Sequence, residues 1–239
     1  WDRFLLGTVH DRELNAYSRT ILFPKNYTTV VLYSGLIEFS YQAAKAVIAA
    51  MHPVRPTATG AAVTANMSDQ HIADELSRNK EPIERLYRTL EAYFFTTGYP
   101  RALHDEQVPV EQAIPLSLLI SMAERWMIGH EYGHGIAARM GFAAKAAGAT
   151  ENPARAEESF ADDNGLILTV VSADRLDHVG PVFSLAGPAF ALACLEVLRR
   201  SESVVRQGRV LPDEGDNIYP PIKARFDHIL NAFDFHFEV

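Results

Sequence analysis

The chain has 239 residues, 48% of them hydrophobic and 22% charged, a composition that excludes a disordered chain, a collagen-like repeat and a disulfide scaffold. The 22 lysines and arginines are outnumbered by 30 aspartates and glutamates, so the net charge of −8 gives no electrostatic attraction to nucleic acid or to an anionic membrane. The single cysteine, Cys194, excludes an internal disulfide and lies in an apolar run, so we expect a buried hydrophobe and a reducing, cytoplasmic setting.

The N-terminal half is predicted to be mostly helical. Ser34 can cap an amphipathic helix over residues 34–51. Residues 52–66 are rich in proline, threonine, alanine and glycine, which is typical of a loop between helices. A polar helix is expected over residues 68–98, with an interruption near Pro82 because proline breaks the helical hydrogen-bond pattern.

The C-terminal half is also predicted to be helical. Pro115 suits the first turn of a long helix over residues 116–140. Another helix is expected over residues 152–171, where an asparagine cap is followed by a proline. The last two predicted helices cover residues 181–200 and 221–232.

Strand signals are few. Residues 27–33 are rich in β-formers, residues 107–110 are short and extended, and residues 233–239 alternate with a period of two. The longest uncharged run, residues 179–195, contains two prolines and is expected to be a buried core helix, so we expect no membrane association. The pattern predicts a mainly α (α+β) protein with a small sheet.

The residues with the clearest chemical signal form an H-E-x-x-H motif inside the long predicted helix: His130, Glu131 and His134. Two histidines four residues apart project from one helical face, so their imidazoles can bind a single Zn²⁺. Glu131 lies about a quarter-turn away and can reach a water at the metal. The alternative is an exposed helix that carries these residues without a function.

A catalytic zinc normally takes three protein ligands. Where the extended metalloprotease pattern needs a third histidine, this chain has Met140. The next predicted helix offers Glu158 and Asp162, which share a face, so Glu158 could bind the metal while Asp162 accepts the outer N–H of a ligand histidine. Their neighbours Glu157 and Asp163 point about 100° away and are expected to be solvated charges.

Two glycines flank the histidines on the same predicted helix, Gly129 and Gly133. Each destabilises a helix interior by roughly 1 kcal/mol relative to alanine, which indicates that something packs very close to them. A close helix crossing and room for the ligand-bearing helix or a substrate chain both remain open.

Together these motifs resemble those of the gluzincin metallopeptidases, whose third ligand is a glutamate in a later E-x-x-A-D motif. Residues 158–162 match that motif as it occurs in the M48-type branch. The segment from Tyr219 to Arg225 is similar to an H-P-P-x-x-x-R segment of M48-type and phage-exclusion Lit-type peptidases, with Tyr219 in place of the histidine. The resemblance implies a zincin-like helical core and places Arg225 near the metal cleft.

By this resemblance the protein is expected to be a zinc-dependent endopeptidase acting on a protein or peptide. Zn²⁺ would be the cofactor, bound by His130, His134 and Glu158, with Glu131 as the general base toward the attacking water. Asp162 would orient a ligand histidine.

The matched C-terminal segment nominates residues that stabilise the negative tetrahedral oxygen: Arg225, Tyr219 and His228. A structural role for Arg225, in an ion pair with Asp162 or Asp227, is equally consistent with the sequence.

We expect a single metallopeptidase domain over residues 1–239, with an N-terminal helical portion at 1–110 and a catalytic core at 111–239. Peptide substrates of this class commonly add to a sheet edge as an extra strand, and residues 107–110 are the candidate edge. Two alternatives remain: a non-catalytic helical module with a structural or regulatory zinc, and a zinc hydrolase of a non-peptide amide. The sequence does not predict the oligomeric state.

Overall fold

The computed structural model describes residues 3–9, 16–21, 27–51, 54–57, 60–63, 68–95, 107–141, 152–177, 179, 181–215 and 219–237. Helices make up most of these residues and a small sheet accompanies them, which confirms the predicted mainly α (α+β) class.

Three strands form the small sheet: β1 (Arg3–Val9), β2 (Ala16–Ile21) and β3 (Tyr27–Tyr33). The strand order is β1-β3-β2, with β3 parallel to β1 and antiparallel to β2. β3 confirms the predicted strand, and its Val30 and Leu32 are buried. β1 and β2 lie in the N-terminal portion predicted to be helical. The side chains of β1 that the structure describes are all exposed, so the strand lacks the alternation of buried and exposed residues by which a strand is recognised.

A second pair of strands corrects the loop predicted over residues 52–66. β4 (Val54–Thr57) and β5 (Gly60–Val63) pair antiparallel within that segment. The sequence predicts a loop in place of these strands for two reasons. Four residues are too few to show a two-residue period, and the proline and glycine in the segment are typical of turns.

The predicted N-terminal helices are confirmed as α1 (Ser34–Met51), α2 (Asp69–Arg78) and α3 (Glu81–Phe95). The interruption lies at Asn79, whose backbone is extended and whose side-chain oxygen accepts a hydrogen bond from the first N–H of α3. Pro82 therefore lies in the first turn of α3, a position that proline tolerates.

The C-terminal half consists mainly of α4 (Val110–Met140), α6 (Pro153–Ser172), α7 (Pro181–Gln207) and α8 (Ile222–Phe237), with a π-helical turn, Ala173–Asp177, after α6. The four predicted helices are thus confirmed, although each differs from the prediction at one or both ends.

The start of α4 and the chain before it differ from the prediction. The N–H of Gln112 donates to the carbonyl of Pro109, so the helix begins at Val110 and Pro115 lies in its second turn. Residues 107–109 are not part of a strand, and the predicted edge strand at 107–110 is wrong. Its apolar and proline residues lead into a helix instead.

The predicted C-terminal strand is also wrong, because residues 233–237 continue α8. Residues 238–239 lie outside the described residues. Ile229 and Phe233 are four residues apart and both buried, which is the helical period. The sequence alternates between apolar and polar residues here, but Phe235, one of the apolar residues, is exposed. The alternation therefore does not mark a buried face of a strand.

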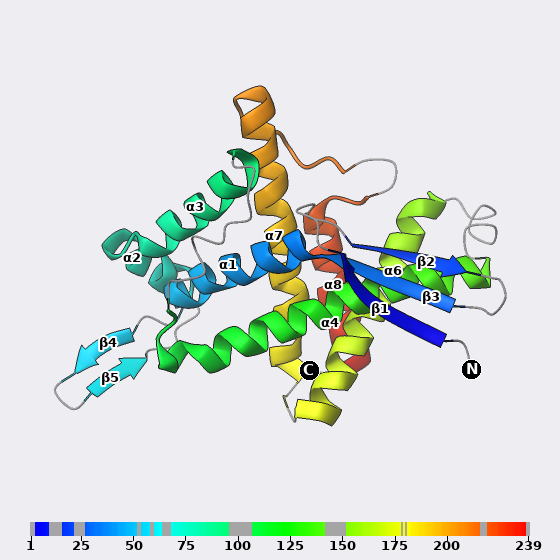
Figure 1. Cartoon of the computed structure of the whole chain (residues 1–239), viewed down its shortest axis with the longest axis horizontal. Helices are drawn as coiled ribbons and strands as arrows, with labels where there is room; N and C mark the ends of the chain where they lie inside the picture. The colour runs from blue at the N-terminus through cyan, green and yellow to red at the C-terminus, as the bar shows by residue number, and fades with distance from the viewer. Residues whose placement is uncertain are drawn as a thin grey trace.

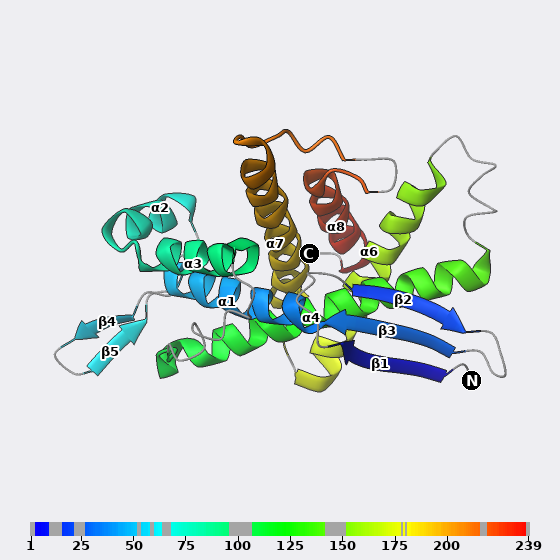
Figure 2. The ribbon, with the colours of Figure 1, turned by 45° about the horizontal axis from the view of Figure 1, so that its top comes forward.

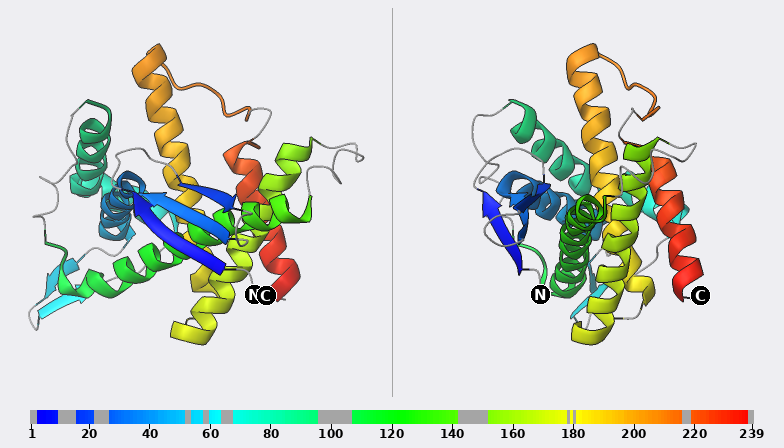
Figure 3. Two further views of the ribbon diagram at one scale, coloured as in Figure 1. Left: turned by 45° about the vertical axis from the view of Figure 1, so that its right-hand side comes forward. Right: turned by 90° about the vertical axis from the view of Figure 1, so that its right-hand side faces the viewer.

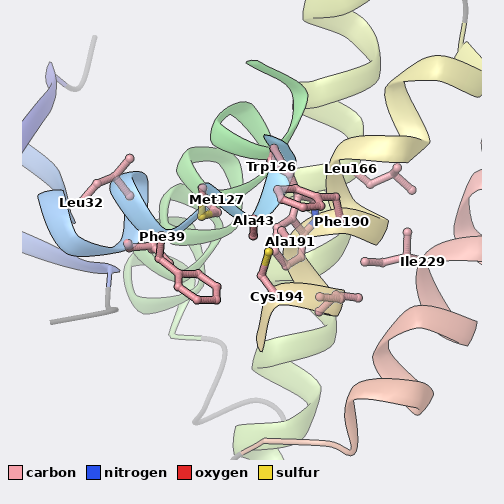
Figure 4. Packing of buried hydrophobic residues seen from close by; sticks show 14 of the residues in the cluster. Leu32, Phe39, Ala43, Trp126, Met127, Leu166, Phe190, Ala191, Cys194 and Ile229 are labelled. Atoms are coloured by element: carbon pink, nitrogen blue, oxygen red, sulfur yellow. The ribbon is translucent and has the colours of Figure 1, made fainter. Parts of the chain in front are cut away.

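One hydrophobic cluster joins β3, α1, α4, α6, α7 and α8. Figure 4 shows Trp126 and Met127 of α4 packed between α1 and α7, with Cys194 beside them. Cys194 is buried, and burial raises the pKa of its thiol to about 12, which confirms the expected buried hydrophobe. Within the described residues no helix is both long enough and apolar enough to cross a membrane.

The long helix α4 lies at the centre of the molecule. In Figure 1 it crosses the middle of the view, and Figure 3 shows the sheet on one side of it and α6, α7 and α8 on the other. Figure 2 shows β2 along the sheet edge nearer α6, and β2 contacts α4. The H-E-x-x-H residues of α4 therefore lie between the sheet and the C-terminal helices.

Candidate metal centre

Glycines let α6 cross very close to the H-E-x-x-H segment of α4. A Cβ added to Gly129 would lie 2.9 Å from the Cα of Gly165, and one added to Gly133 would lie 2.8 Å from the Cα of Ala161. Both distances are too short for real side chains, so this crossing requires glycine at these positions. The two explanations left open for the glycines coincide, because the closely crossing helix is the one that carries Glu158.

Gly133→Ala is expected to destabilise the protein by about 1–3 kcal/mol, because the new methyl group would displace α6. The sign of the change in unfolding free energy tests the crossing, because replacing glycine with alanine inside a helix ordinarily stabilises by about 1 kcal/mol. Denaturant unfolding measures the effect, with Gly7→Ala as control because no atom of the described part of the chain lies within 4 Å of its added Cβ. A Gly133→Ala variant as stable as the wild type would contradict the crossing.

The crossing brings three predicted ligands together: His130, His134 and Glu158. Each offers one ligand atom, and these atoms lie within 4.8 Å of one another. The two Nε2 atoms are 3.2 Å apart, and Glu158 lies 3.6 Å from His130 Nε2 through Oε2 and 3.3 Å from His134 Nε2 through Oε1. The group is close enough to hold a metal ion.

The chemistry of this donor set fits a divalent cation. Glu158 is buried, and its Oε2 accepts no hydrogen bond from the part of the chain that the structure describes. A buried carboxylate oxygen without a donor is unfavourable unless a cation or a proton neutralises it. The Nε2 atoms of His130 and His134 face each other, and the Glu158 carboxylate lies against both, so one metal ion would satisfy all three groups at once.

Each imidazole is oriented by its own carboxylate of α6. Asp162 Oδ1 lies 2.9 Å from His130 Nδ1, which confirms the predicted contact. Glu157 Oε1 lies 3.1 Å from His134 Nδ1, so the expectation that Glu157 is simply solvated is wrong. Ionised carboxylates only accept hydrogen bonds, so Nδ1 donates on both rings and Nε2 is the nitrogen that each ring directs at Glu158.

Arg225 of α8 forms the ion pair with Asp162 that the sequence left open. Its Nε lies 2.9 Å from Asp162 Oδ2 and its Nη2 lies 2.7 Å from Oδ1, and the arginine side chain is 7% exposed. Burial alone would raise the pKa of Asp162, but hydrogen bonds from His130 and Arg225 outweigh it and lower that pKa. The other suggested partner, Asp227, instead accepts from Lys223.

Arg225 also borders the ligand group. Its Nη2 is 3.8 Å from Glu158 Oε2, and its guanidinium lies 5.9 Å from the centre of the Trp126 ring. Trp126 lies one turn before His130, and the two ring centres are 5.4 Å apart. Trp126 is part of the hydrophobic cluster and also packs against the candidate ligand group.

The other two nominated residues of the C-terminal segment lie outside the ligand group. Tyr219 is exposed, and of the charges that raise the pKa of Arg225 that of its ionised phenol has the smallest effect. His228 Nε2 lies 2.8 Å from Asp163 Oδ1, an α8–α6 contact that leaves both side chains partly exposed. Asp163, expected to be solvated, therefore has a histidine partner.

Glu131 is partly buried beside the ligand group. Burial raises the pKa of its carboxyl group, and the charges of His130 and His134 partly offset that effect. Burial therefore makes this carboxylate a better proton acceptor than that of an exposed glutamate.

The metal-free protein is predicted to hold a proton on His134. Burial lowers the pKa of His134, but the hydrogen bond and charge of Glu158 and the hydrogen bond to Glu157 outweigh it and raise the pKa from 6.5 to about 9. Protonated His134 thus stabilises the metal-free fold fully below about pH 6.5, and this contribution is lost as the pH rises through about 9. Metal affinity should rise with pH over the same range because the metal displaces that proton.

An NMR titration of the His134 ring in metal-free protein measures this pKa. A midpoint near 6.5 would contradict the predicted effect of the two glutamates.

Comparisons of the chain with protein families, with curated proteins and with solved structures found no match. The likeness to gluzincins therefore depends on the motifs and on the geometry described above.

Proposed function

We propose that this protein is a zinc-dependent endopeptidase that hydrolyses peptide bonds of a protein substrate. The observation that carries the proposal is the convergence of His130, His134 and Glu158, with a carboxylate on the outer nitrogen of each imidazole. Two histidines and one glutamate are a ligand set of catalytic zinc sites, which leave the fourth position for water or substrate.

The ligand count favours catalysis over a structural zinc. Structural sites are usually closed by four protein ligands and favour cysteine. Among the residues that the structure describes, three metal-ligating side chains come together, and Cys194 belongs to the hydrophobic cluster. A bound Zn²⁺ supplies Lewis-acid activation of a carbonyl group and lowers the pKa of a water molecule.

In this proposal the chain's own residues bind the metal, orient the ligand histidines and transfer protons. His130 and His134 present Nε2, Asp162 and Glu157 hold the rings, and Glu131 accepts the proton of the attacking water on its carboxylate. Glu131 then gives this proton to the departing amine, which completes the hydrolysis.

Arg225 acts here as a positioning residue, because its Nε and Nη2 bind Asp162, which in turn holds His130. Of the nominated oxyanion donors, we assign the role to Tyr219, which is exposed beside Arg225. His228 is bound to Asp163 and is not needed for this step.

The sheet offers another candidate for substrate binding. β2 is an outer strand of the described sheet, whose order is β1-β3-β2, and it contacts α4, so its outer edge is the place where an extended peptide would add in this proposal (Figure 2). It replaces residues 107–110 in this role.

A peptide library digestion tests the proposal. Metal-stripped protein is reloaded with one equivalent of Zn²⁺ and incubated with a library of proteome-derived peptides, and new N-termini are identified by mass spectrometry. We expect cleavage with the reloaded protein and none with the stripped protein. Zinc binding without cleavage of any peptide would contradict peptidase activity and leave a non-peptide amide hydrolase or a regulatory module.

A further inference from the structure

The carboxylates of α6 at the metal centre have different partners. Glu158 faces both Nε2 atoms, Asp162 binds His130 Nδ1, and Glu157 binds His134 Nδ1. One acidic residue is therefore placed as a ligand and two are placed behind the ligand histidines.

The two orienting carboxylates differ in how much charge they offer to their histidines. Asp162 is 1% exposed and shares both oxygens with Arg225 at 2.9 Å and 2.7 Å. Glu157 is 29% exposed, and no lysine or arginine nitrogen of the described chain lies within 4 Å of its carboxylate. Within the described chain, no lysine or arginine shares the negative charge of Glu157, and this charge acts on the ring of His134.

We infer that Glu157 is the positioning residue of His134 and sets the metal affinity of the site. Its carboxylate holds the tautomer that carries the proton on Nδ1, keeps the Nε2 lone pair directed at the metal and makes that nitrogen a better donor. This inference rests on the metal-binding part of the proposed function and does not require a peptide substrate.

Zn²⁺ affinity measured by chelator competition tests this role in the full chain. Glu157→Ala is expected to weaken Zn²⁺ binding about 10–100-fold, the usual effect of losing such a partner. Glu157→Gln keeps an oxygen that accepts the Nδ1 hydrogen bond but loses the charge, so its affinity should lie between those of Glu157→Ala and the wild type.

Asp163→Ala is the matched control. Asp163 lies on the same helix, is 34% exposed and binds a histidine, but that histidine is not in the ligand group. Its removal is expected to leave Zn²⁺ affinity unchanged.

A spectroscopic readout separates positioning from a general loss of structure. In zinc-loaded protein the Nδ1 proton of His134 should give a protected NMR signal in the wild type and in Glu157→Gln, and lose it in Glu157→Ala. Equal Zn²⁺ affinity in Glu157→Ala and the wild type would overturn this inference alone. A wild-type chain that binds no Zn²⁺ would overturn both this inference and the proposed function.

Discussion

Glu131→Gln is expected to lower the rate of peptide hydrolysis by about 10²–10⁴-fold and to leave one metal ion bound per chain. Glutamine has nearly the same shape but cannot accept the proton of the attacking water or return it to the amine. The metal should stay because the group that could hold it, His130, His134 and Glu158, does not include Glu131.

The rate is measured on a peptide found in the library digestion, and the metal content by elemental analysis of the same sample. Glu124→Gln is the control, because Glu124 lies two turns earlier on α4 and burial also raises the pKa of its carboxyl group. Its rate should equal that of the wild type. Full activity in Glu131→Gln would remove the general-base role.

His134→Ala is expected to lose metal and hydrolysis together. The substitution removes one of three ligand atoms and leaves the buried carboxylate of Glu158 with one imidazole. Because His134 is not fully buried and alanine favours a helix, we expect the helix to remain.

Elemental analysis after dialysis measures the loss, and circular dichroism checks the fold. His228→Ala serves as the control for metal content, since it removes a nearby histidine whose partner is Asp163. Metal stoichiometry that is the same in His134→Ala and the wild type would contradict the ligand set.

The candidate metal-binding group could be predicted because the pairs of residues that form it are local. His130 and His134 share a face of one helix, and so do Glu158 and Asp162 on another, so the helical period is enough to pair them. The ends of those helices are marked by residues such as Gly141, which adopts the left-handed conformation after α4.

The contact of Glu157 with His134 could not be predicted from the sequence, because it depends on how α6 crosses α4. From the helical period alone it points away from the face of Glu158, and only the close approach at Gly133 brings it to the outer nitrogen of His134. The sequence leaves the partner of Arg225 open between Asp162 and Asp227 because it also depends on how two helices pack. The packing of α8 on α6 places Arg225 against Asp162.

The strand errors have a different physical cause. Residues 233–237 alternate like a strand, but burial of Ile229 and Phe233 four residues apart keeps them helical. β1 lies at the edge of the described sheet, and the side chains of residues 5–9 are exposed, so no side-chain pattern reveals its backbone pairing with β3.

X-ray absorption at the zinc edge, on protein loaded with one equivalent of Zn²⁺, tests the central claim most directly. The account predicts imidazole nitrogens of His130 and His134 at about 2.0–2.1 Å and oxygen ligands at about 2.0–2.2 Å, with no sulfur. A spectrum without imidazole scattering, or with a sulfur shell at about 2.3 Å, would contradict it.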